Sequence, residues 1–385
     1  MKYCTKCVMP DTRPGVFLDD NGVCNACRHA EYKKTVDWKA RKKEFGKLCD
    51  KYRRKGHEYD CLIAVSSGKD SYYQINLLKN EFNMNPLLVN VWNLDWTKTG
   101  LENWEKMLSV FGVDSISLHL NRELNRKMTR IGFEHDGFPA WMWDRCVYTY
   151  PIQMAIRMNI PLVIYGENVN IEYGGHQTKE TPSALEQINN DVSRDYGWGL
   201  WTKNGISMNE LNMAQYPTKE EIEKVKLDPR YISYYFNWSG WEHYQVAKKL
   251  GFKDLNMTKE WKKEGFVEHY DQIDDFAYQI DPWLKYPKYG HARTTDVCCY
   301  WIRDGLISRD EAIPLVRDND WKIDPTALGN FLDFTGYSED EFWKIVEKFW
   351  NKEIFHKVDG KWDLKNPIWK QEPQKVNPNL SFLSP

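Results

Sequence analysis

Six consecutive small or polar residues are the stretch of this chain best suited to chemistry: Ser66-Ser67-Gly68-Lys69-Asp70-Ser71. An apolar run precedes them and a helical pattern follows. Gly and Ser let backbone N–H groups approach an anion, and a helix start adds partial positive charge. Lys69 adds a full charge, so we predict a phosphate-binding loop. An ordinary helix N-cap favours the same residue types, and the Walker A pattern is absent.

Two Cys-x2-Cys motifs near the start of the chain are a second chemical signal. Sixteen residues separate Cys4 and Cys7 from Cys24 and Cys27, a spacing typical of a zinc ribbon. Each pair can supply two thiolates to a closed tetrahedral site. The Asp-Asp-Asn-Gly sequence at 19–22 predicts a hairpin turn before the second pair. We expect a structural Zn²⁺ without a catalytic role; an iron–sulfur cluster or four unligated thiols are the alternatives.

Apolar runs alternate with helical patterns from about residue 59 to 168, which indicates βαβ units around a parallel sheet. The runs are near-continuous, as buried parallel strands are, and lie at 61–65, 87–91, 115–118 and 161–165. Helical spacing is found between them at 71–80 and 101–111, and later in the chain at 241–250, 306–317 and 339–350.

The elements predict an α/β fold, a doubly wound parallel sheet with an N-terminal zinc ribbon and a mainly helical C-terminal region. We expect four parts along the chain. They are a Cys4 zinc ribbon at 1–30, a helical linker at 31–57, an ATP-binding domain at 58–180 and a helical substrate or partner region at 181–385.

Composition narrows the function classes. The formal charge is −2 without a long basic run, whereas nucleic-acid binding usually needs a basic surplus, so we expect no nucleic-acid partner. No signal-peptide pattern and no apolar stretch of membrane-spanning length is visible, so we expect a soluble, cytoplasmic protein. The 18 Trp and 22 Tyr are mostly core residues, and the remainder would suit sugar rings or nucleobases.

The loop at 66–71 resembles the S-G-G-x-D-S pyrophosphate loop of the adenine nucleotide α-hydrolase (PP-loop) superfamily, with Ser67 in place of the first Gly. Members of that group cleave ATP between the α and β phosphates and leave AMP on a carbonyl or amide oxygen. Three further segments resemble the N-acetyl sugar amidotransferase family: 4–15, 161–175 and 288–296, the last close to K-[FY]-G-x-x-R-x-T-D. The resemblance spans about residues 1–320. That family makes acetamidino sugars for bacterial surface polysaccharides, including lipopolysaccharide O antigen, and nonulosonic acids such as pseudaminic acid.

The resemblance implies an ATP-dependent amidotransferase (a C–N ligase that forms AMP and pyrophosphate) that converts an acetamido group to an acetamidino group through an adenylate. Its cofactors would be ATP and Mg²⁺. The expected catalytic residues are Lys69, Asp70 and Glu167. Nucleotide binding is expected from Ser66, Ser67, Gly68, Lys69, Asp70 and Ser71, together with Val91, Asn93 and Gly166 at strand ends, where ligands of such sheets bind. Contacts to the sugar are expected from Asn168, Glu172, His291, Arg293 and Asp296.

Ammonia has no visible source within the chain. A triad glutaminase needs a Cys on a tight Gly-flanked elbow, which is absent, and Cys4 lies too far inside for an N-terminal nucleophile. We therefore expect a separate glutaminase subunit as partner, as the resemblance also implies, and an acetamido sugar, either free or nucleotide-linked, as substrate.

Two other functions remain open from the sequence. A PP-loop tRNA sulfur transferase would share the loop and the ribbon, and it would need a reactive cysteine among Cys146, Cys298 and Cys299. We interpret these three instead as small buried apolar side chains, which free Cys often is. The other alternative is a nucleotide-binding scaffold without catalytic activity. The loop residues Lys69, Asp70 and Ser71 are all present, which argues against it.

Overall fold

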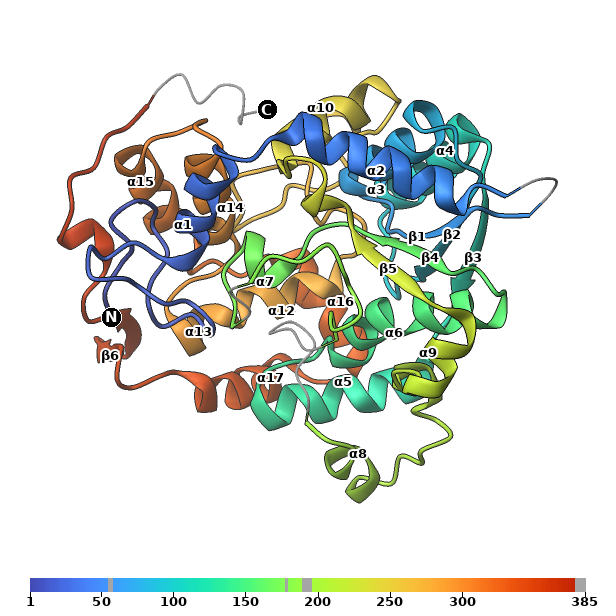
Figure 1. The fold of residues 1–385 in the computed structure, drawn as a ribbon. Helices are drawn as coiled ribbons and strands as arrows, with labels where there is room; N and C mark the ends of the chain where they lie inside the picture. Colours follow the sequence, from blue (N-terminus) through green and yellow to red (C-terminus); the bar gives the residue numbers. More distant parts are fainter. Residues whose placement is uncertain (55–57, 177–178, 189–195, 378–385) are drawn as a thin grey trace.

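The computed structural model describes residues 1–54, 58–176, 179–188 and 196–377. At its centre lies a parallel five-stranded sheet in the order β3-β2-β1-β4-β5 (Figure 1). The strands are β1 (Cys61–Ala64), β2 (Pro86–Val91), β3 (Asp114–Leu118), β4 (Leu162–Tyr165) and β5 (Asp228–Tyr231). The first four strands confirm the four apolar runs that we predicted as strands.

Each face of the sheet has its own apolar core, because successive strand residues point to opposite faces. Cys61 and Ile63 of β1 pack on one face, and Leu62 packs on the other; all three side chains are fully buried. The first face is covered by α2 (Trp38–Tyr52), α3 (Lys69–Ile75), α4 (Lys98–Phe111) and α10 (Gly240–Lys249). The second is covered by α5 (Arg122–Asp136) and α6 (Trp141–Arg157). The doubly wound α/β architecture is therefore confirmed.

Strand β5 comes from the part of the chain that we expected to be helical. It pairs in parallel with β4 at the sheet edge. Its sequence, Asp-Pro-Arg-Tyr, is polar and only every second residue is buried. Pro lacks a backbone donor and is tolerated on edge strands, so the apolar-run criterion that found the central strands could not find this one.

The strand order reverses between β1 and β4. From β1 the chain proceeds outward through β2 to β3, whereas β4 leads to β5 on the opposite side. Ligands of open α/β sheets bind at such a switch point, outside the carboxyl ends of the strands. The loop at 66–71 follows β1, and residues 166–168 follow β4, so the topology brings these two segments to the same edge.

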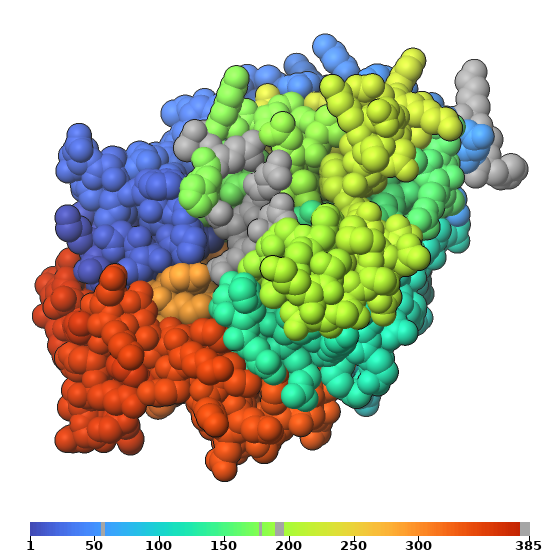
Figure 2. All heavy atoms as spheres, turned by 90° about the horizontal axis from the view of Figure 1, so that it is seen from below, coloured from blue at the N-terminus to red at the C-terminus, as the bar shows by residue number. Residues whose placement is uncertain are grey.

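The N-terminal ribbon packs against helices from the other end of the chain. Its four cysteines share an apolar cluster with residues of α14 (Arg293–Arg303) and α15 (Arg309–Asn319). Figure 2 shows that the blue N-terminal residues also lie against red residues from near the C-terminus. Helix α1 (Asn25–Lys33) follows, and its N-cap is Cys24, whose Sγ accepts the Cys27 N–H.

Helices dominate the C-terminal part, as predicted. The segments expected at 241–250, 306–317 and 339–350 correspond to α10, α15 and α17 (Glu339–Val346), the last extended by η5 (Glu347–Phe349). The pattern expected at 71–80 is α3 continued by the π-helix η1 (Asn76–Glu81). The end of the expected linker, 55–57, lies outside the described residues.

The remaining elements are short or connect the larger ones. The helices among them are α7 (Val169–Glu172), α8 (Gly199–Lys203), α9 (Lys219–Val225), α11 (Leu255–Thr258), α12 (Ile280–Trp283), α13 (Lys285–Tyr289) and α16 (Pro325–Thr335). The 3-10 turns are η2 (Asn212–Ala214), η3 (Ile232–Tyr234), η4 (Ala277–Gln279) and η6 (Ile368–Lys370), and β6 (Phe355–Val358) forms a hairpin with β7 (Lys361–Leu364).

Candidate functional site

A cavity of about 800 Å³ lies at the switch point of the sheet. Its floor includes Lys69 after β1, Asn93 after β2 and Glu167 after β4. The other walls come from the N-terminal region, from α10, from the segment around Asp271, and from α12 to α14. This volume is typical of pockets that hold a cofactor or a substrate, and its mixed lining offers both charged groups and aromatic faces.

The loop at 66–71 is held by its own serines and by a distant carboxylate. Ser66 N–H donates to Ser71 Oγ at 2.9 Å, and Gly68 N–H donates to Ser66 Oγ at 3.1 Å. Ser67, which stands where the superfamily pattern has Gly, is 1% exposed and donates to Asp274 Oδ2 at 3.0 Å. The Ser67 hydroxyl therefore ties the loop to a segment far along the chain, a contact that a Gly could not make.

A chain of buried and partly buried charges runs from the loop to α14. Lys69 Nζ lies 2.9 Å from Asp70 Oδ2 and 2.8 Å from Asp271 Oδ1, and Asp271 also pairs with Arg293. Burial alone would lower the pKa of Lys69, but the Asp271 and Asp70 carboxylates outweigh it and raise the pKa. Lys69 and Arg293 are therefore both charged and both line the cavity, so one wall carries two cations beside the loop.

His243 of α10 fixes the second oxygen of Asp70. Its Nδ1 lies 2.7 Å from Asp70 Oδ1, and its ring stacks on Tyr73 with the centroids 3.9 Å apart. Burial lowers the pKa of His243 despite the nearby Asp70, so the ring is neutral and donates from Nδ1 to the carboxylate. Asp70 is thus oriented by Lys69 on one side and by His243 on the other.

Glu167 faces the loop across the switch point. It is half-buried, and its carboxylate accepts a hydrogen bond from Tyr173 Oη at 3.1 Å. Burial first, and the Asp70 charge second, raise the pKa of Glu167 to about 7. A carboxyl group with such a pKa can accept or release a proton near neutral pH, which is what general acid–base chemistry requires.

The N-terminal region builds the wall opposite the sheet. Lys33 of α1 pairs with Glu172 at 2.9 Å and also donates to the Trp238 carbonyl at 3.0 Å. Arg13 of the ribbon donates to the carbonyls of Tyr173 and Gly174. The ribbon and α1 thereby hold the segment after β4 in place, and Arg13, Lys33 and Glu172 all line the cavity.

The structure brings many of the predicted site residues together. Those that line the cavity are Ser66, Gly68, Lys69, Asp70, Asn93, Glu167, Glu172, Arg293 and Asp296. The predicted residues that do not line it are Ser67, Ser71, Val91, Gly166, Asn168 and His291.

These six have structural surroundings of their own; His291, for example, is 1% exposed and its ring stacks near that of Tyr289. Ser67 and Ser71 form the loop bonds described above, and Val91 is buried in the core beneath α6. Asn168 is the N-cap of α7, where its side chain accepts the Asn170 N–H. At Gly166 a Cβ would lie 2.9 Å from the Trp238 ring, so Gly permits that close contact.

Asp271, Asp274 and His243 are site residues that sequence reasoning did not find. The two aspartates lie in the acidic stretch Asp271-Gln272-Ile273-Asp274-Asp275, which is a visible signal but has no motif spacing. His243 lies within a helical pattern and is fully buried. Their importance comes from partners about 170 to 200 residues earlier in the chain, which no local pattern reveals.

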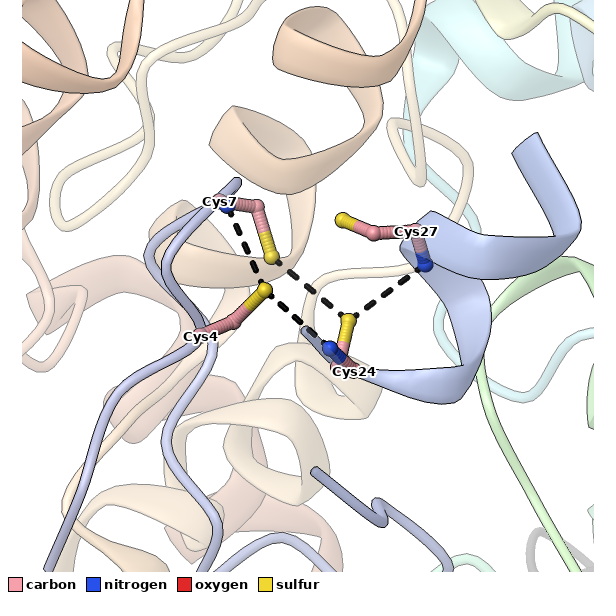
Figure 3. A group of neighbouring side chains, drawn as sticks. All are labelled: Cys4, Cys7, Cys24 and Cys27. Carbon is pink, nitrogen blue, oxygen red and sulfur yellow. Dashed lines mark hydrogen bonds between the residues drawn. The ribbon is translucent and has the colours of Figure 1, made fainter. Parts of the chain in front are cut away.

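The four cysteines of the ribbon converge on one point (Figure 3). All four are buried, and their sulfurs lie within 4.8 Å of one another; the Cys7 and Cys24 sulfurs are 3.8 Å apart. Zinc–sulfur bonds of about 2.3 Å place tetrahedral sulfurs about 3.8 Å apart. The four sulfurs can therefore hold one Zn²⁺, and the space between them suits a single ion rather than a cluster of several iron atoms.

Backbone donors support the ribbon sulfurs. Cys7 N–H and Cys24 N–H donate to Cys4 Sγ at 3.5 and 3.3 Å, and Cys27 N–H donates to Cys24 Sγ at 3.4 Å. Such bonds stabilise thiolates, which are the form that binds metal. The predicted turn at 19–22 is also present, because Gly22 N–H donates to the Asp19 carbonyl at 2.8 Å.

The other cysteines lie away from the cavity. Cys146, Cys298 and Cys299 are each fully buried in apolar clusters, and none of them is among the residues that line the cavity within the described ranges. Burial raises the pKa of Cys146 to about 12, which makes it a poor nucleophile. Their surroundings fit the interpretation as small buried apolar side chains.

Comparisons with known proteins bear on the region that supplies Asp271 and Arg293. Residues 264–368 match the family model described as "LPS biosynthesis protein WbpG-like, C-terminal domain". A Methanocaldococcus jannaschii protein named "Uncharacterized protein MJ1599" is 30% identical over 313 residues, which are 80% of this chain and 91% of that protein. The chain belongs to the same family as this archaeal protein. The family-model match at 264–368 confirms the resemblance to proteins of lipopolysaccharide biosynthesis for the C-terminal region.

A solved structure from Methanocaldococcus jannaschii, described as a predicted subunit of a tRNA methyltransferase, is a more distant likeness. It is 13% identical, with a TM-score of 0.26, over 49% of this chain and 73% of its own. A likeness of this size supports no conclusion about this chain.

Among the described residues of the chain, no helix combines the length and apolar character needed to span a bilayer.

Proposed function

We propose that the chain is the synthase subunit of an ATP-dependent amidotransferase. It would convert the acetamido group of a bacterial surface sugar to an acetamidino group, in O-antigen, lipopolysaccharide or nonulosonic acid synthesis. The observation that carries the proposal is the ion chain in which Lys69 of the loop pairs with Asp271, and Asp271 with Arg293. Asp271 and Arg293 belong to the region that matches the lipopolysaccharide-biosynthesis domain, so the nucleotide loop and that domain share one cavity.

ATP would bind with its phosphates at the loop. Lys69 and Arg293 supply the positive charge for the β and γ phosphates, and phosphate oxygens would take over loop N–H groups such as Gly68 N–H, which now donates to Ser66 Oγ. Fixed charges aimed at the departing pyrophosphate stabilise the transition state. Asn93, after β2, lines the same cavity and would contact the adenine.

The residues around the loop also fit a magnesium ion that arrives with ATP. Mg²⁺ is usually held through one or two carboxylates together with phosphate oxygens. Asp70 and Asp274 both line the cavity beside the loop, so these two would hold the ion. Bound Mg²⁺ supplies neutralisation of phosphate charge.

The acetamido oxygen attacks the α-phosphorus of ATP, and the bond to pyrophosphate breaks. Ammonia then adds to the acetamido carbon, the added nitrogen loses one proton, and the C–O bond to AMP breaks with its electron pair leaving on AMP. Glu167 is the group placed to take that proton, because its pKa of about 7 allows a carboxylate to do so near neutral pH. The cavity orients the two reactants, which replaces an encounter in solution.

Zinc and a partner complete the proposal. A structural Zn²⁺ in the ribbon would hold Arg13 and α1, and thereby the wall that contains Glu172. Ammonia would come from a separate glutaminase subunit. A purified chain that used glutamine unaided as nitrogen donor would contradict this part of the proposal.

The test is an incubation with ATP, ammonium and a nucleotide-activated diacetamido sugar. We expect AMP and pyrophosphate in equal amounts, and a sugar product whose mass reflects replacement of one oxygen by NH. Lys69→Ala should abolish both products. Absence of AMP would refute the proposal, and AMP formed only with tRNA would favour a tRNA sulfur transferase instead.

A further inference from the structure

The cavity has a second end whose chemistry differs from that of the phosphate loop. Trp143 and Asp144 of α6, Tyr278 of η4 and Asp281 of α12 line it, and we call these four residues the acidic end. The Trp143 and Tyr278 ring centroids are 5.3 Å apart, and Tyr278 Oη donates to Asp144 Oδ1 at 3.3 Å. Aromatic faces and carboxyl groups are therefore combined in one small patch.

Several polar atoms of residues that line this cavity are buried without a hydrogen-bond partner. Asp144 is 4% exposed, and its Oδ2 has no partner. Trp143 Nε1 has none either, and neither has Nδ2 of Asn125, a residue of α5 that is 3% exposed and lines the same cavity. Buried polar groups are almost always hydrogen-bonded, so three orphaned atoms at one cavity call for a ligand that satisfies them.

The three atoms require a ligand with both donors and acceptors. Asp144 Oδ2 offers an acceptor, whereas Trp143 Nε1 and Asn125 Nδ2 can only donate. A metal cation would face two donors, and among the described residues only the four ribbon cysteines bring three or more potential ligands together. A phosphate group at the acidic end would lie beside the carboxyls of Asp144 and Asp281. The cations Lys69 and Arg293, which suit a phosphate, lie at the loop instead.

Sugar hydroxyl and acetamido groups have the required character. A hydroxyl donates and accepts at once, and the apolar face of a pyranose ring suits an aromatic side chain. We propose that the acidic end is the sugar subsite, in which Asp144 accepts from a ring hydroxyl while Trp143 and Asn125 donate to oxygens of the same neutral sugar. The inference rests on the proposed function and places the hydroxyl-bearing ring at α5, α6 and α12, apart from the nucleotide phosphates.

The test measures binding in the full-length protein without turnover. N-acetylglucosamine is the probe, followed by saturation-transfer NMR with the nucleotide site filled by α,β-methylene-ATP, which cannot release pyrophosphate. N-cyclohexylacetamide is the second probe, because it keeps the acetamido group but lacks the hydroxyls. The variants are Asp144→Leu and Asn125→Ala, and Asp333→Leu, at an exposed position of α16, is the matched control.

We expect wild type and Asp333→Leu to bind N-acetylglucosamine equally. Asp144→Leu and Asn125→Ala should each weaken it by about tenfold, the loss that corresponds to one hydrogen bond to a buried group. Binding of α,β-methylene-ATP should not change. Asp144→Leu should leave binding of N-cyclohexylacetamide unchanged, since that ligand has no hydroxyls for Asp144 to accept from.

A stability measurement separates this role from a structural one. Asp144→Leu loses the hydrogen bond from Tyr278 Oη at 3.3 Å but also removes a buried oxygen, Oδ2, that has no partner, so we expect a Tm within a few degrees of that of wild type. Unchanged N-acetylglucosamine binding in both variants, or no binding by wild type, would overturn the inference. A larger Tm decrease with loss of both probes would also overturn it. Failure of AMP formation alone would refute the proposed function and leave this binding result intact.

Discussion

The ion pair between Lys69 and Asp271 joins the phosphate loop to the C-terminal region, and a double-mutant cycle can measure that connection. The variants are Lys69→Met, Asp271→Asn and the double variant. Lys69 Nζ and Asp271 Oδ1 are 2.8 Å apart, and the side chains are 4% and 21% exposed. Neither substitution changes the side-chain volume greatly, so the charges are the main difference.

The expected loss in the free energy of unfolding depends on the buried charge that each substitution leaves without a partner. Removing one partner of a buried ion pair costs about 3–5 kcal/mol because the other charge stays buried. In Lys69→Met, Asp271 keeps Arg293 and Asp70 keeps His243, so we expect the lower end, about 3 kcal/mol. The unfolding entropy is about 2.1 cal/mol/K per residue. For 385 residues, a loss of about 3 kcal/mol therefore lowers the Tm by about 4 °C.

The double variant should cost less than the sum of the single variants. It removes the cation and one of its two carboxylates together, so we expect a coupling free energy of at least about 1 kcal/mol. Urea unfolding followed by circular dichroism measures the free energies of unfolding. Because Lys69 is buried and Asp271 mostly so, most of the coupling should persist at high salt, where exposed pairs are screened.

Additive free energies, within about 0.5 kcal/mol, would refute the reasoning, because they would show that Lys69 and Asp271 do not interact. A coupling that vanishes at 1 M salt, where the Debye length is about 3 Å, would show that the pair is exposed to solvent rather than buried.

Three further predictions concern catalysis and the ribbon. At constant free ammonia, amidine formation should rise with pH through about 7, where the raised pKa of Glu167 lets the carboxylate form; Glu167→Gln should flatten this limb in a rate–pH profile. Removal of zinc by a chelator should lower the Tm and abolish ATP-dependent activity, since Arg13 and Lys33 lose their anchor; added Zn²⁺ should restore both. His243→Leu should raise the KM for ATP about tenfold, the loss of one hydrogen bond to Asp70, whereas His243→Asn, which retains a donor, should recover most of it.

Each of these has a result that would count against it. An unchanged pH limb in Glu167→Gln would exclude this residue as the proton acceptor. Full activity after zinc removal, with the removal verified by metal analysis, would show that the cavity does not depend on metal in the ribbon. Equal KM values in His243→Leu and wild type would show that Asp70 needs no second partner.

Much of the framework could be predicted from local patterns. Strands β1, β2 and β4 were visible as apolar runs because burial on both faces leaves few polar positions. The ribbon was visible because two knuckles and a turn fix the Cys spacing within a few residues. The loop at 66–71 was visible because strand, loop and helix are consecutive. Strand β5 was not visible, since an edge strand with Pro229 has neither the apolar content nor the donors that the central strands need.

The site residues divide in the same way. Lys69, Asp70 and Glu167 were predicted as site residues because they follow strands, and the carboxyl ends of parallel strands meet at one edge. Strand ends did not specify which side chains reach the cavity: Val91 is buried in the core, whereas Asn93, two residues later, lines the cavity.

The sequence by itself therefore determined the loop at 66–71, the four-cysteine ribbon and the parallel sheet, because each depends on residues close together in the chain. Only the tertiary structure decided what completes the loop. It placed Asp274 on Ser67, Asp271 on Lys69 and His243 on Asp70, from segments more than 170 residues away. These partners meet only when the chain closes around the cavity, and their energies come from burial and charge in a place that no local pattern defines.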